Sequence, residues 1–356
     1  MKELMKTDVV GIGNALLDYQ VHTSFEFLKQ HHLISGSMTL VDANTQKDLL
    51  SKIHKHFPKD HVRRSSGGCA ANTIAGIRNF GGSSSFIGKI GKDPIGEFYQ
   101  QDLERIGVSV HLQSSNVQST GTCLAFITPD AERTMITHLG IATELHEKDI
   151  PTAPIQNTKI VYFEGYLWDS PSANKACLKA MDIAKQENKK IALTFSDALC
   201  VERHFDEFRH LTQSKVDILF CNEKEALKAT NTNRVEDAFR SLQQWCDIVH
   251  ITTGPRGALV ASRKENFAEE IPTWNVKLVD KLGAGDLYAA GVLYGLTHGK
   301  NLKESSFLGC YSATRIIQQM SARLEVSLKA DIEKVQEGPT PKSGRQRICS
   351  LAGCSD

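Results

Sequence analysis

The sequence predicts a three-layer α/β/α fold, in which a mainly parallel sheet lies between two layers of helices, with a small β-sheet lid beside it. First, short apolar runs typical of buried strands alternate with helical stretches through the second half of the chain. Second, glycine-rich turns lead straight into segments with helical spacing. Third, residues 120–140 hold two alternating strands joined by a turn, which indicates a hairpin rather than a strand–helix unit.

The length and composition narrow the class of protein. With 356 residues, the chain can form one large α/β domain or a main domain with an appendage. We expect one domain over residues 1–330, whose lid is formed by about 17–42 and 119–140. Residues 331–356 are rich in Pro, Gly, Ser and charge, and we expect a loosely ordered tail there.

The charge balance favours a small-molecule partner. Lys plus Arg total 42 and Asp plus Glu total 41, so neither a nucleic acid nor a membrane is indicated. No apolar run approaches the roughly 20 residues of a membrane span, and the N-terminus lacks the apolar core of a signal peptide. We expect a cytoplasmic monomer or homodimer. Nine scattered cysteines without a Cys-x-x-Cys pair form neither a disulfide framework nor a zinc pattern.

The elements of the N-terminal third follow from local patterns. Residues 8–21, "DVVGIGNALLDYQV", start as a buried strand, turn at two glycines and continue as a second strand. "SMTLVD", residues 37–42, is another short strand. Residues 65–68 form a polar glycine loop that feeds a helix ending at Gly81.

The rest of the chain continues the α/β alternation around the hairpin. "SSFIGKIG" is a strand, and "DPIGEFYQQDLERIG" is a helix closed by Gly107. After the hairpin, five more apolar strands alternate with helical stretches, as expected for a mainly parallel sheet covered on both faces. They are "KIVYFEG", "KKIALTFSD", "VDILFCN", "IVHITTG" and "ALVASR".

The stretch "DKLGAGD" carries the strongest chemical signal. Gly283, Ala284 and Gly285 precede an apolar helix, so the backbone N–H groups of the first turn can form an anion hole. Asp286 would repel a phosphate unless it takes a proton from the group that attacks that phosphate. Alternatively, Asp286 is an ordinary first-turn acid that stabilises the helix dipole by roughly 0.3 to 1 kcal/mol.

Two other strand ends offer polar groups. Asn14 and Asp18, together with Asn72 on the helix after the glycine loop, suit a polyhydroxylated ligand. Alternatively, Asn72 is an early-helix polar residue and Asp18 a turn former. The segment "GIGNAL" lacks the third glycine of a dinucleotide fingerprint, which disfavours a Rossmann site.

"CNEKEAL" offers an amide and a carboxylate three residues apart, Asn222 and Glu225, at the end of a buried strand. Oxygen ligands of this kind suit Mg²⁺, which retains several waters. A helix cap with a first-turn Glu explains the same pair. In "TTGPRG", the residues Thr253, Gly254 and Gly257 belong either to a hairpin turn or to a loop along the phosphates of a nucleotide.

Three of these segments, in this order, resemble a known family. "GGCAANTIAGIRNFGG", "NEKE" and "DKLGAGD" look like the signature segments of the ribokinase-like (PfkB) carbohydrate and nucleoside kinases. The resemblance covers the chain from about residue 8 to 324. Within that family, "GNALLD" and "ERTMITHLG" are similar to segments of the adenosine kinases.

The resemblance implies ATP-dependent phosphorylation of a primary hydroxyl, with Mg²⁺ as cofactor. Asp286 would be the base, and Gly283, Ala284 and Gly285 the anion hole. Arg133 on the lid would reach over the phosphates. The remaining implied roles concern binding: Asn14, Asp18, Gly67, Gly68 and Asn72 would hold the acceptor; Asn222, Thr253, Gly254, Gly257, Gly283 and Gly285 would bind ATP; and Asn222 with Glu225 would organise Mg²⁺ through waters.

One departure from the family pattern concerns the residues before the anion hole. The usual segment is Asp-Thr-x-Gly-Ala-Gly-Asp, and here Lys281 replaces the threonine, with Leu282 after it. Lys281 could bind phosphate, displace the monovalent cation (K⁺) that many members hold nearby, or reduce activity.

We expect a nucleoside kinase with an adenosine-like preference. A sugar kinase of the ribokinase or fructokinase type is the alternative, and a catalytically weak nucleotide-binding regulatory protein is a more remote one.

Overall fold

The computed structural model describes residues 6–130, 132–335 and 337–339. Within these residues, nine strands form a large sheet in the order β14-β13-β12-β11-β10-β9-β1-β5-β6. Neighbouring strands from β12 to β6 run parallel, whereas β13 and β14 pair antiparallel at one edge, so the expected mainly parallel sheet is confirmed. The strands are β1 (Thr7–Ile12), β5 (Ser84–Gly91), β6 (Ser109–Ser115), β9 (Thr158–Glu164), β10 (Lys190–Thr194), β11 (Ile218–Asn222), β12 (Ile248–Thr252), β13 (Ala258–Ser262) and β14 (Phe267–Ile271).

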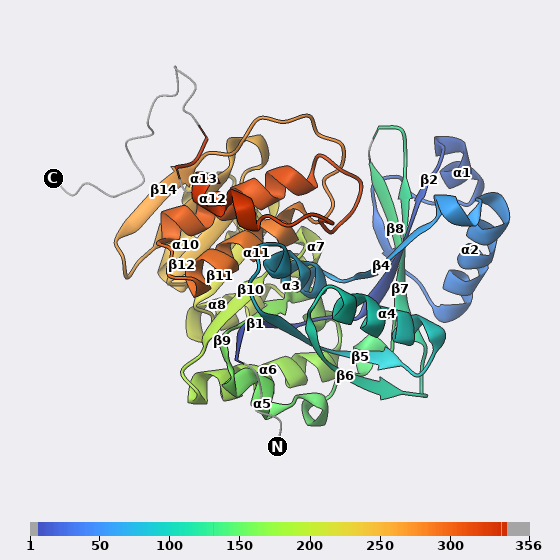
Figure 1. Cartoon of the computed structure of the whole chain (residues 1–356), viewed down its shortest axis with the longest axis horizontal. Coiled ribbons are helices and arrows are strands. Elements are labelled where there is room, and N and C mark those ends of the chain that lie inside the picture. The colour runs from blue at the N-terminus through green and yellow to red at the C-terminus, as the bar shows by residue number, and fades with distance from the viewer. Residues whose placement is uncertain (1–5, 131, 336, 340–356) are drawn as a thin grey trace.

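Helices cover both faces of this sheet (Figure 1). One face packs against α5 (Thr152–Gln156), α6 (Pro171–Gln186), α7 (Ala198–Arg203), α8 (Phe205–Ser214), α9 (Glu223–Thr230) and α10 (Val235–Trp245). The other packs against α3 (Cys69–Asn79), α4 (Pro94–Arg105), α11 (Ala284–Thr297), α12 (Leu302–Ile316) and α13 (Ile332–Val335). Side chains alternate along each strand: Val10 and Ile12 of β1 join the first core cluster, and Val9 joins the second. Both faces are therefore apolar, as a doubly covered sheet requires.

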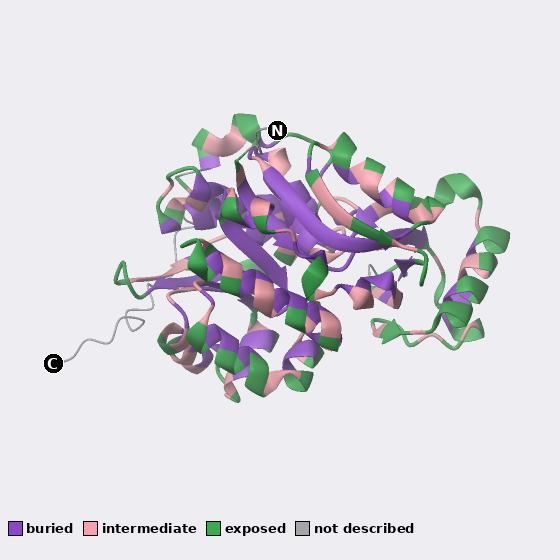
Figure 2. Cartoon of the chain, turned by 90° about the horizontal axis from the view of Figure 1, so that it is seen from below, coloured by how far each residue is buried: buried purple, intermediate pink, exposed green. Residues whose placement is uncertain are grey.

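A second sheet stands beside the large one and forms the lid, in the strand order β3-β8-β7-β2-β4 (Figure 1). Its strands are β2 (Leu16–His22), β3 (Met38–Leu40), β4 (Arg63–Gly67), β7 (Thr120–Ile127) and β8 (Arg133–Gly140). Helices α1 (Phe25–Gln30) and α2 (Ala43–His56) belong to the same unit and bury one face of this sheet in a third apolar cluster. Figure 2 shows that the outer surfaces of these two helices are exposed.

The segment before helix α3 is a strand of the lid rather than the predicted loop. Residues 65–68 were expected to be a loop, but residues 63–67 are strand β4, and only Gly68 caps helix α3. The neighbouring strand explains the difference, because β4 pairs antiparallel with β2 and places Asp18 opposite Ser65. A polar, glycine-containing segment becomes a strand when a partner strand supplies its backbone hydrogen bonds.

The C-terminal boundary also differs from the expected one. The predicted tail from residue 331 begins with helix α13, whose Val335 is 3% exposed and packs in the core cluster around α11 and α12. Residues 340–356, the rest of that predicted tail, lie outside the described residues.

Among the helices that the structure describes, none combines the length and apolar character needed to cross a membrane. Each cysteine that the structure describes is a free thiol.

Candidate active site

A cavity of about 380 Å³ lies between the large sheet and the lid. The carboxyl ends of five parallel strands open into it through residues at or just after each end: Asn14, Glu164, Thr194, Asn222 and Thr252. Ligands of open α/β sheets bind at this edge, where the chain leaves the strands. The opposite wall is the inner face of the lid, which contributes every second residue of its strands.

The structure brings most of the predicted site residues to this one cavity. Those that line it are Asn14, Asp18, Gly68, Asn72, Asn222, Glu225, Gly283, Ala284, Gly285 and Asp286. Those that do not line it are Gly67, Arg133, Thr253, Gly254 and Gly257. Lys281 and Leu282, the departures from the family pattern, also line it.

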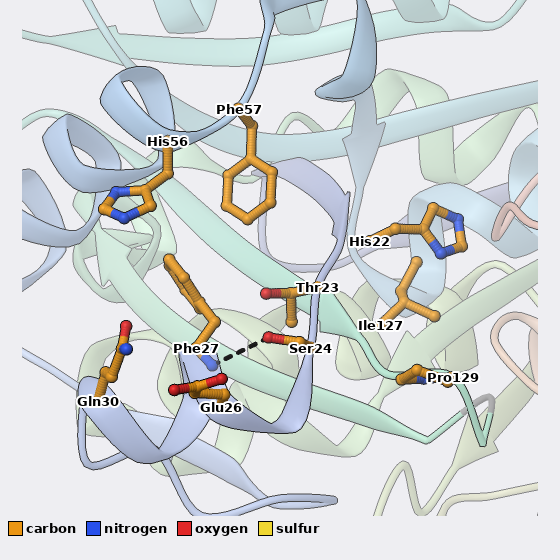
Figure 3. Close-up of a pocket in the computed structure, with 10 residues that line it drawn as sticks. All are labelled: His22, Thr23, Ser24, Glu26, Phe27, Gln30, His56, Phe57, Ile127 and Pro129. Carbon is orange, nitrogen blue, oxygen red and sulfur yellow. Dashed lines mark hydrogen bonds between the residues drawn. The ribbon is translucent and has the colours of Figure 1, made fainter.

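A second cavity, of about 630 Å³, lies on the lid and holds none of the predicted site residues. Figure 3 shows its wall, with Phe27 and Phe57 between His22 and His56. The predicted polar residues converge in the first cavity, which is therefore the candidate site.

The first turn of α11 forms one side of the candidate site. Gly283 caps this helix with φ +72°, and a Cβ there would lie 2.6 Å from the carbonyl oxygen of Ala322. Only glycine suits both constraints. A Cβ on Gly285 would meet no atom within 4 Å, so the helix terminus is open toward the cavity. The N–H groups of such a turn attract an anion, although that of Ala284 already donates to the carbonyl oxygen of Lys281 at 3.3 Å.

Asp286 lies in the same turn and accepts a hydrogen bond from Nδ2 of Asn72 at 3.0 Å. Burial raises the pKa of Asp286 to about 7; the hydrogen bond from Asn72 opposes this rise, and the negative charge of Glu164 adds to it. A carboxyl with a pKa near neutrality can accept and release a proton at physiological pH.

Asp18 faces the cavity from β2. The residue is 8% exposed, and burial raises its pKa to about 7, although the positive charges of Arg323 and Arg133 oppose the rise. Gly67 lies beside it in β4, and a Cβ on Gly67 would overlap the Asp18 carboxyl group. Gly67 therefore leaves space for Asp18 and does not itself line the cavity.

Glu164, which sequence reasoning missed, holds the predicted residue Asn14 and the first turn of α3 in place. Its Oε1 accepts hydrogen bonds from the backbone N–H and the Nδ2 of Asn14, both at 2.8 Å. Its Oε2 accepts the backbone N–H of Ala70, in the first turn of α3, at 2.8 Å. The residue is 1% exposed, and burial raises its pKa despite these bonds. The available signal was an acid that ends an otherwise apolar strand, "KIVYFEG".

Arg323 was also missed. Its Nε donates to Oδ1 of Asn72 at 3.0 Å, so that Asn72 bridges Arg323 and Asp286. No local pattern marks this arginine, which follows α12 in an irregular segment.

Asn222 and Glu225 form the helix cap that was the alternative explanation for them. Oδ1 of Asn222 accepts the N–H of Glu225 at 3.0 Å, and Oε2 of Glu225 accepts the N–H of Asn222 at 3.1 Å. Both residues also line the cavity, so the cap does not exclude a role in binding. Burial raises the pKa of Glu225 to about 7, and the negative charges of Asp197 and Asp286 add to the rise.

Arg133 was expected above the phosphates, but in this structure it forms a buried ion pair with Asp280. Its Nε donates to Oδ1 of Asp280 at 2.7 Å, and its Nη2 donates to Oδ2. Oδ1 of Asp280 also accepts the N–H of Leu282 at 3.0 Å. The guanidinium pairs with this carboxylate because both groups are removed from water. The pair joins lid strand β8 to the loop before α11.

The segment of Thr253, Gly254 and Gly257 forms the hairpin turn between β12 and β13. The N–H of Thr253 donates to the carbonyl of Gly257 at 2.8 Å, and Gly257 has φ +102°. A Cβ on Gly257 would collide with the carbonyl oxygen of Ile271. The turn accounts for these glycines without a ligand, and a role in ATP binding stays a prediction.

The wall of the cavity is rich in acidic side chains. Among the described residues that line it, six are acidic and one is basic: Asp18, Glu164, Asp169, Asp197, Glu225 and Asp286 against Lys281. Carboxylate oxygens are the donors that a hard divalent cation such as Mg²⁺ prefers.

Comparisons with known proteins agree on the family of this chain. The model of the pfkB family carbohydrate kinases matches residues 33–328. The adenosine kinase of Saccharomyces cerevisiae is 29% identical over 332 residues, which span 89% of this chain and 96% of that protein. The crystal structure of an adenosine kinase from Sinorhizobium meliloti is 35% identical with a TM-score of 0.85, covering 92% of this chain and 99% of that one.

A third similar structure carries a different name. It is a probable sugar kinase from Rhizobium etli, 34% identical with a TM-score of 0.86, and it covers 93% of this chain and 99% of its own.

The raised pKa of Asp286 predicts a stability effect of known sign. Between about pH 4 and 7 the folded protein binds a proton here that the unfolded chain releases, so this group's contribution to stability is lost as the pH rises through about 7. We expect Asp286→Asn to raise the free energy of unfolding at pH 8 by about 1 kcal/mol or more, and to change it less at pH 5.

Urea denaturation of both proteins without ligands, at pH 5 and pH 8, measures this difference. Asp48→Asn, at an exposed position of helix α2, serves as the control. An Asp286→Asn variant less stable than the wild type at pH 8 would show that the folded protein does not disfavour this charge.

Proposed function

The chain belongs to the pfkB family of carbohydrate kinases, phosphotransferases with an alcohol group as acceptor, and we propose that it transfers the γ-phosphoryl group of ATP to the 5′ hydroxyl of a nucleoside, with adenosine preferred. The observation that carries the proposal is the two-part wall of the cavity. One part is polar and acidic, and the other is an apolar face of the lid.

The apolar face favours a nucleoside over a free sugar. Met38 and Met135 lie directly opposite each other in the register of β3 and β8 and both line the cavity. The apolar lining residues from the lid strands are Leu16, Met38, Leu40, Ala125, Met135 and Leu139. A base buries apolar surface against such a wall, whereas a sugar would place hydroxyl groups there without partners.

The polar part suits the ribose. The Asp18 carboxylate can accept hydrogen bonds from two neighbouring hydroxyls, and each bond to a charged group contributes roughly 1.5 to 3 kcal/mol. Asn14, which Glu164 orients, and the backbone at Gly68 would complete the acceptor site.

In the proposed reaction, Asp286 takes the proton of the 5′ hydroxyl while that oxygen forms a bond to the γ-phosphorus. The bond between this phosphorus and the β–γ bridging oxygen breaks, and ADP leaves. The N–H groups at Gly283, Ala284 and Gly285 would stabilise the negative charge on the transferred group. The lid, held to the α11 loop by Arg133, would exclude water as a competing acceptor.

Kinases of this family use ATP and Mg²⁺. Asn222 and Glu225 would hold the metal through its waters, and the metal would neutralise phosphate charge. The ATP site would extend along Asn222, the turn at Thr253, Gly254 and Gly257, and the α11 terminus. A K⁺ site near the anion hole stays a prediction, because Lys281 stands where the family pattern has a threonine.

A sugar kinase is the second candidate, favoured by the Rhizobium etli structure of that name. The two candidates share the base and the anion hole, and only the acceptor differs. A panel of acceptors therefore separates them.

We expect adenosine to give the highest kcat/KM of the panel, and 2′-deoxyadenosine to be poorer by about tenfold or more, because it leaves part of the Asp18 carboxylate unpaired. Asp18→Ala should largely erase the difference between the two nucleosides. Steady-state kinetics with adenosine, 2′-deoxyadenosine, ribose and fructose measure this, with Asp48→Ala on the lid surface as the matched control. A kcat/KM for a free sugar that equals or exceeds that for adenosine would reject the nucleoside assignment.

The metal assignment predicts a change in Mg²⁺ dependence. Glu225→Gln removes a charge that would orient the waters of the metal, so the Mg²⁺ concentration for half-maximal rate should rise by about threefold or more. Glu223→Gln is the matched control, since Glu223 lies in the same first turn but pairs with Arg256. An unchanged Mg²⁺ dependence in Glu225→Gln would leave Glu225 with its capping role alone.

A further inference from the structure

Arg323 joins three separate parts of the molecule behind the wall of the active site. The residue is 9% exposed and lies in the segment between α12 and α13. Its Nε donates to Oδ1 of Asn72 on α3 at 3.0 Å. Its Nη1 donates to Oγ of Ser66 on lid strand β4 and lies 3.5 Å from Oδ2 of Asp102 on α4.

We propose that Arg323 is a positioning residue for phosphoryl transfer, which fixes the side-chain amide of Asn72 so that its N–H₂ group faces Asp286, and which ties lid strand β4 to the same point. The proposal rests on the proposed role of Asp286 as the base. It assigns Arg323 no contact with substrate.

Arg323 fixes the orientation of the Asn72 amide. An amide has an acceptor end and a donor end, and rotation by 180° exchanges them. Because Arg323 can only donate, it selects the orientation in which Oδ1 of Asn72 faces the guanidinium. Nδ2 then faces Asp286 and donates to it at 3.0 Å. The opposite orientation would place two oxygen atoms against each other.

Acidic groups surround Asp286: Glu164 on β9, Asp18 on β2 and Glu225 on α9 each disfavour a second negative charge. The groups that favour the charge are the Asn72 amide and the Cys69 thiol, which both donate hydrogen bonds to it, Arg323 behind the amide, and Lys281, which lines the same cavity.

Arg323 is itself held in place by Ser66 and Asp102. Oδ2 of Asp102 accepts hydrogen bonds from the N–H and Oγ of Ser66, at 3.0 and 2.6 Å, and so positions the hydroxyl that accepts from Arg323. A planar guanidinium can serve Asn72 and Ser66 at once in fixed directions, which a lysine ammonium cannot do. Ser66 on lid strand β4 is thus connected to Asp286 by a chain of hydrogen bonds through Arg323 and the amide of Asn72.

The test is the pH dependence of kcat/KM in Arg323→Met and Arg323→Lys. The acid limb of this profile is the fall in kcat/KM at low pH, where Asp286 becomes protonated. Without Arg323, the Asn72 amide is no longer held with its N–H₂ group toward the charged form of Asp286. The midpoint of the acid limb should therefore shift from about pH 7 upward by about 1 pH unit. At pH 7, kcat/KM should fall by roughly fivefold or more and recover at higher pH, with KM for ATP within about twofold of the wild type. Arg323→Lys should show a smaller shift in the same direction.

Arg63→Met is the matched control, because Arg63 also links β4 to this segment, through Glu325 and the carbonyl of Met320, but lies at the surface. It should leave the acid limb where it is. Thermal melts identify the variants that fold. A folded Arg323→Lys or Arg323→Met protein whose acid limb coincides with that of the wild type would overturn the proposal.

The profile is measured with whichever acceptor the wild type phosphorylates best. A free sugar as the best acceptor would therefore reject the nucleoside assignment and leave this test intact. A wild type whose kcat/KM shows no acid limb would reject the base instead.

Discussion

Negative charge held away from bulk water is the constraint on which the site depends. Asp18 and Glu225 are buried and Asp286 is half-buried; the loss of hydration raises the pKa of each to about 7, and they share one cavity. Such a group is costly unless donors or cations face it. The surrounding structure supplies them: the first turn of α3 faces Glu164, and the first turn of α11 opens toward the cavity beside Asp286. The charge that remains would be matched by the metal and the acceptor hydroxyls.

Two buried arginines connect the lid to this charged centre. Arg133 extends from lid strand β8 to Asp280 in the loop before α11, and Arg323 extends from the C-terminal segment to Ser66 of lid strand β4. Arg323 also donates to Asn72, which donates to Asp286, and Asp280 lies in the loop that leads into the helix of Asp286. Hydrogen bonds therefore connect the lid with the elements that hold the proposed base.

Local sequence signals were sufficient for features whose cause is local. The strand ends, the helix N-termini and the cap of Asn222 and Glu225 depend on residues within a few positions of one another. The remaining features depend on partners far away in sequence. Glu164 holds Asn14 across 150 positions, Arg323 meets Asn72 across 251, and β4 is a strand because β2 pairs with it. Arg133 could be placed on the lid, but its partner Asp280 lies 147 positions away.

The central claim is that Asp286 takes the proton from the acceptor hydroxyl, and the most direct measurement is the turnover of Asp286→Asn at saturating adenosine and ATP. The account predicts a kcat lower than that of the wild type by roughly 10²-fold or more, with the Kd for ATP within about twofold, because the amide keeps the hydrogen bond from Asn72 but cannot act as the base. A folded Asp286→Asn enzyme with the kcat of the wild type would contradict it.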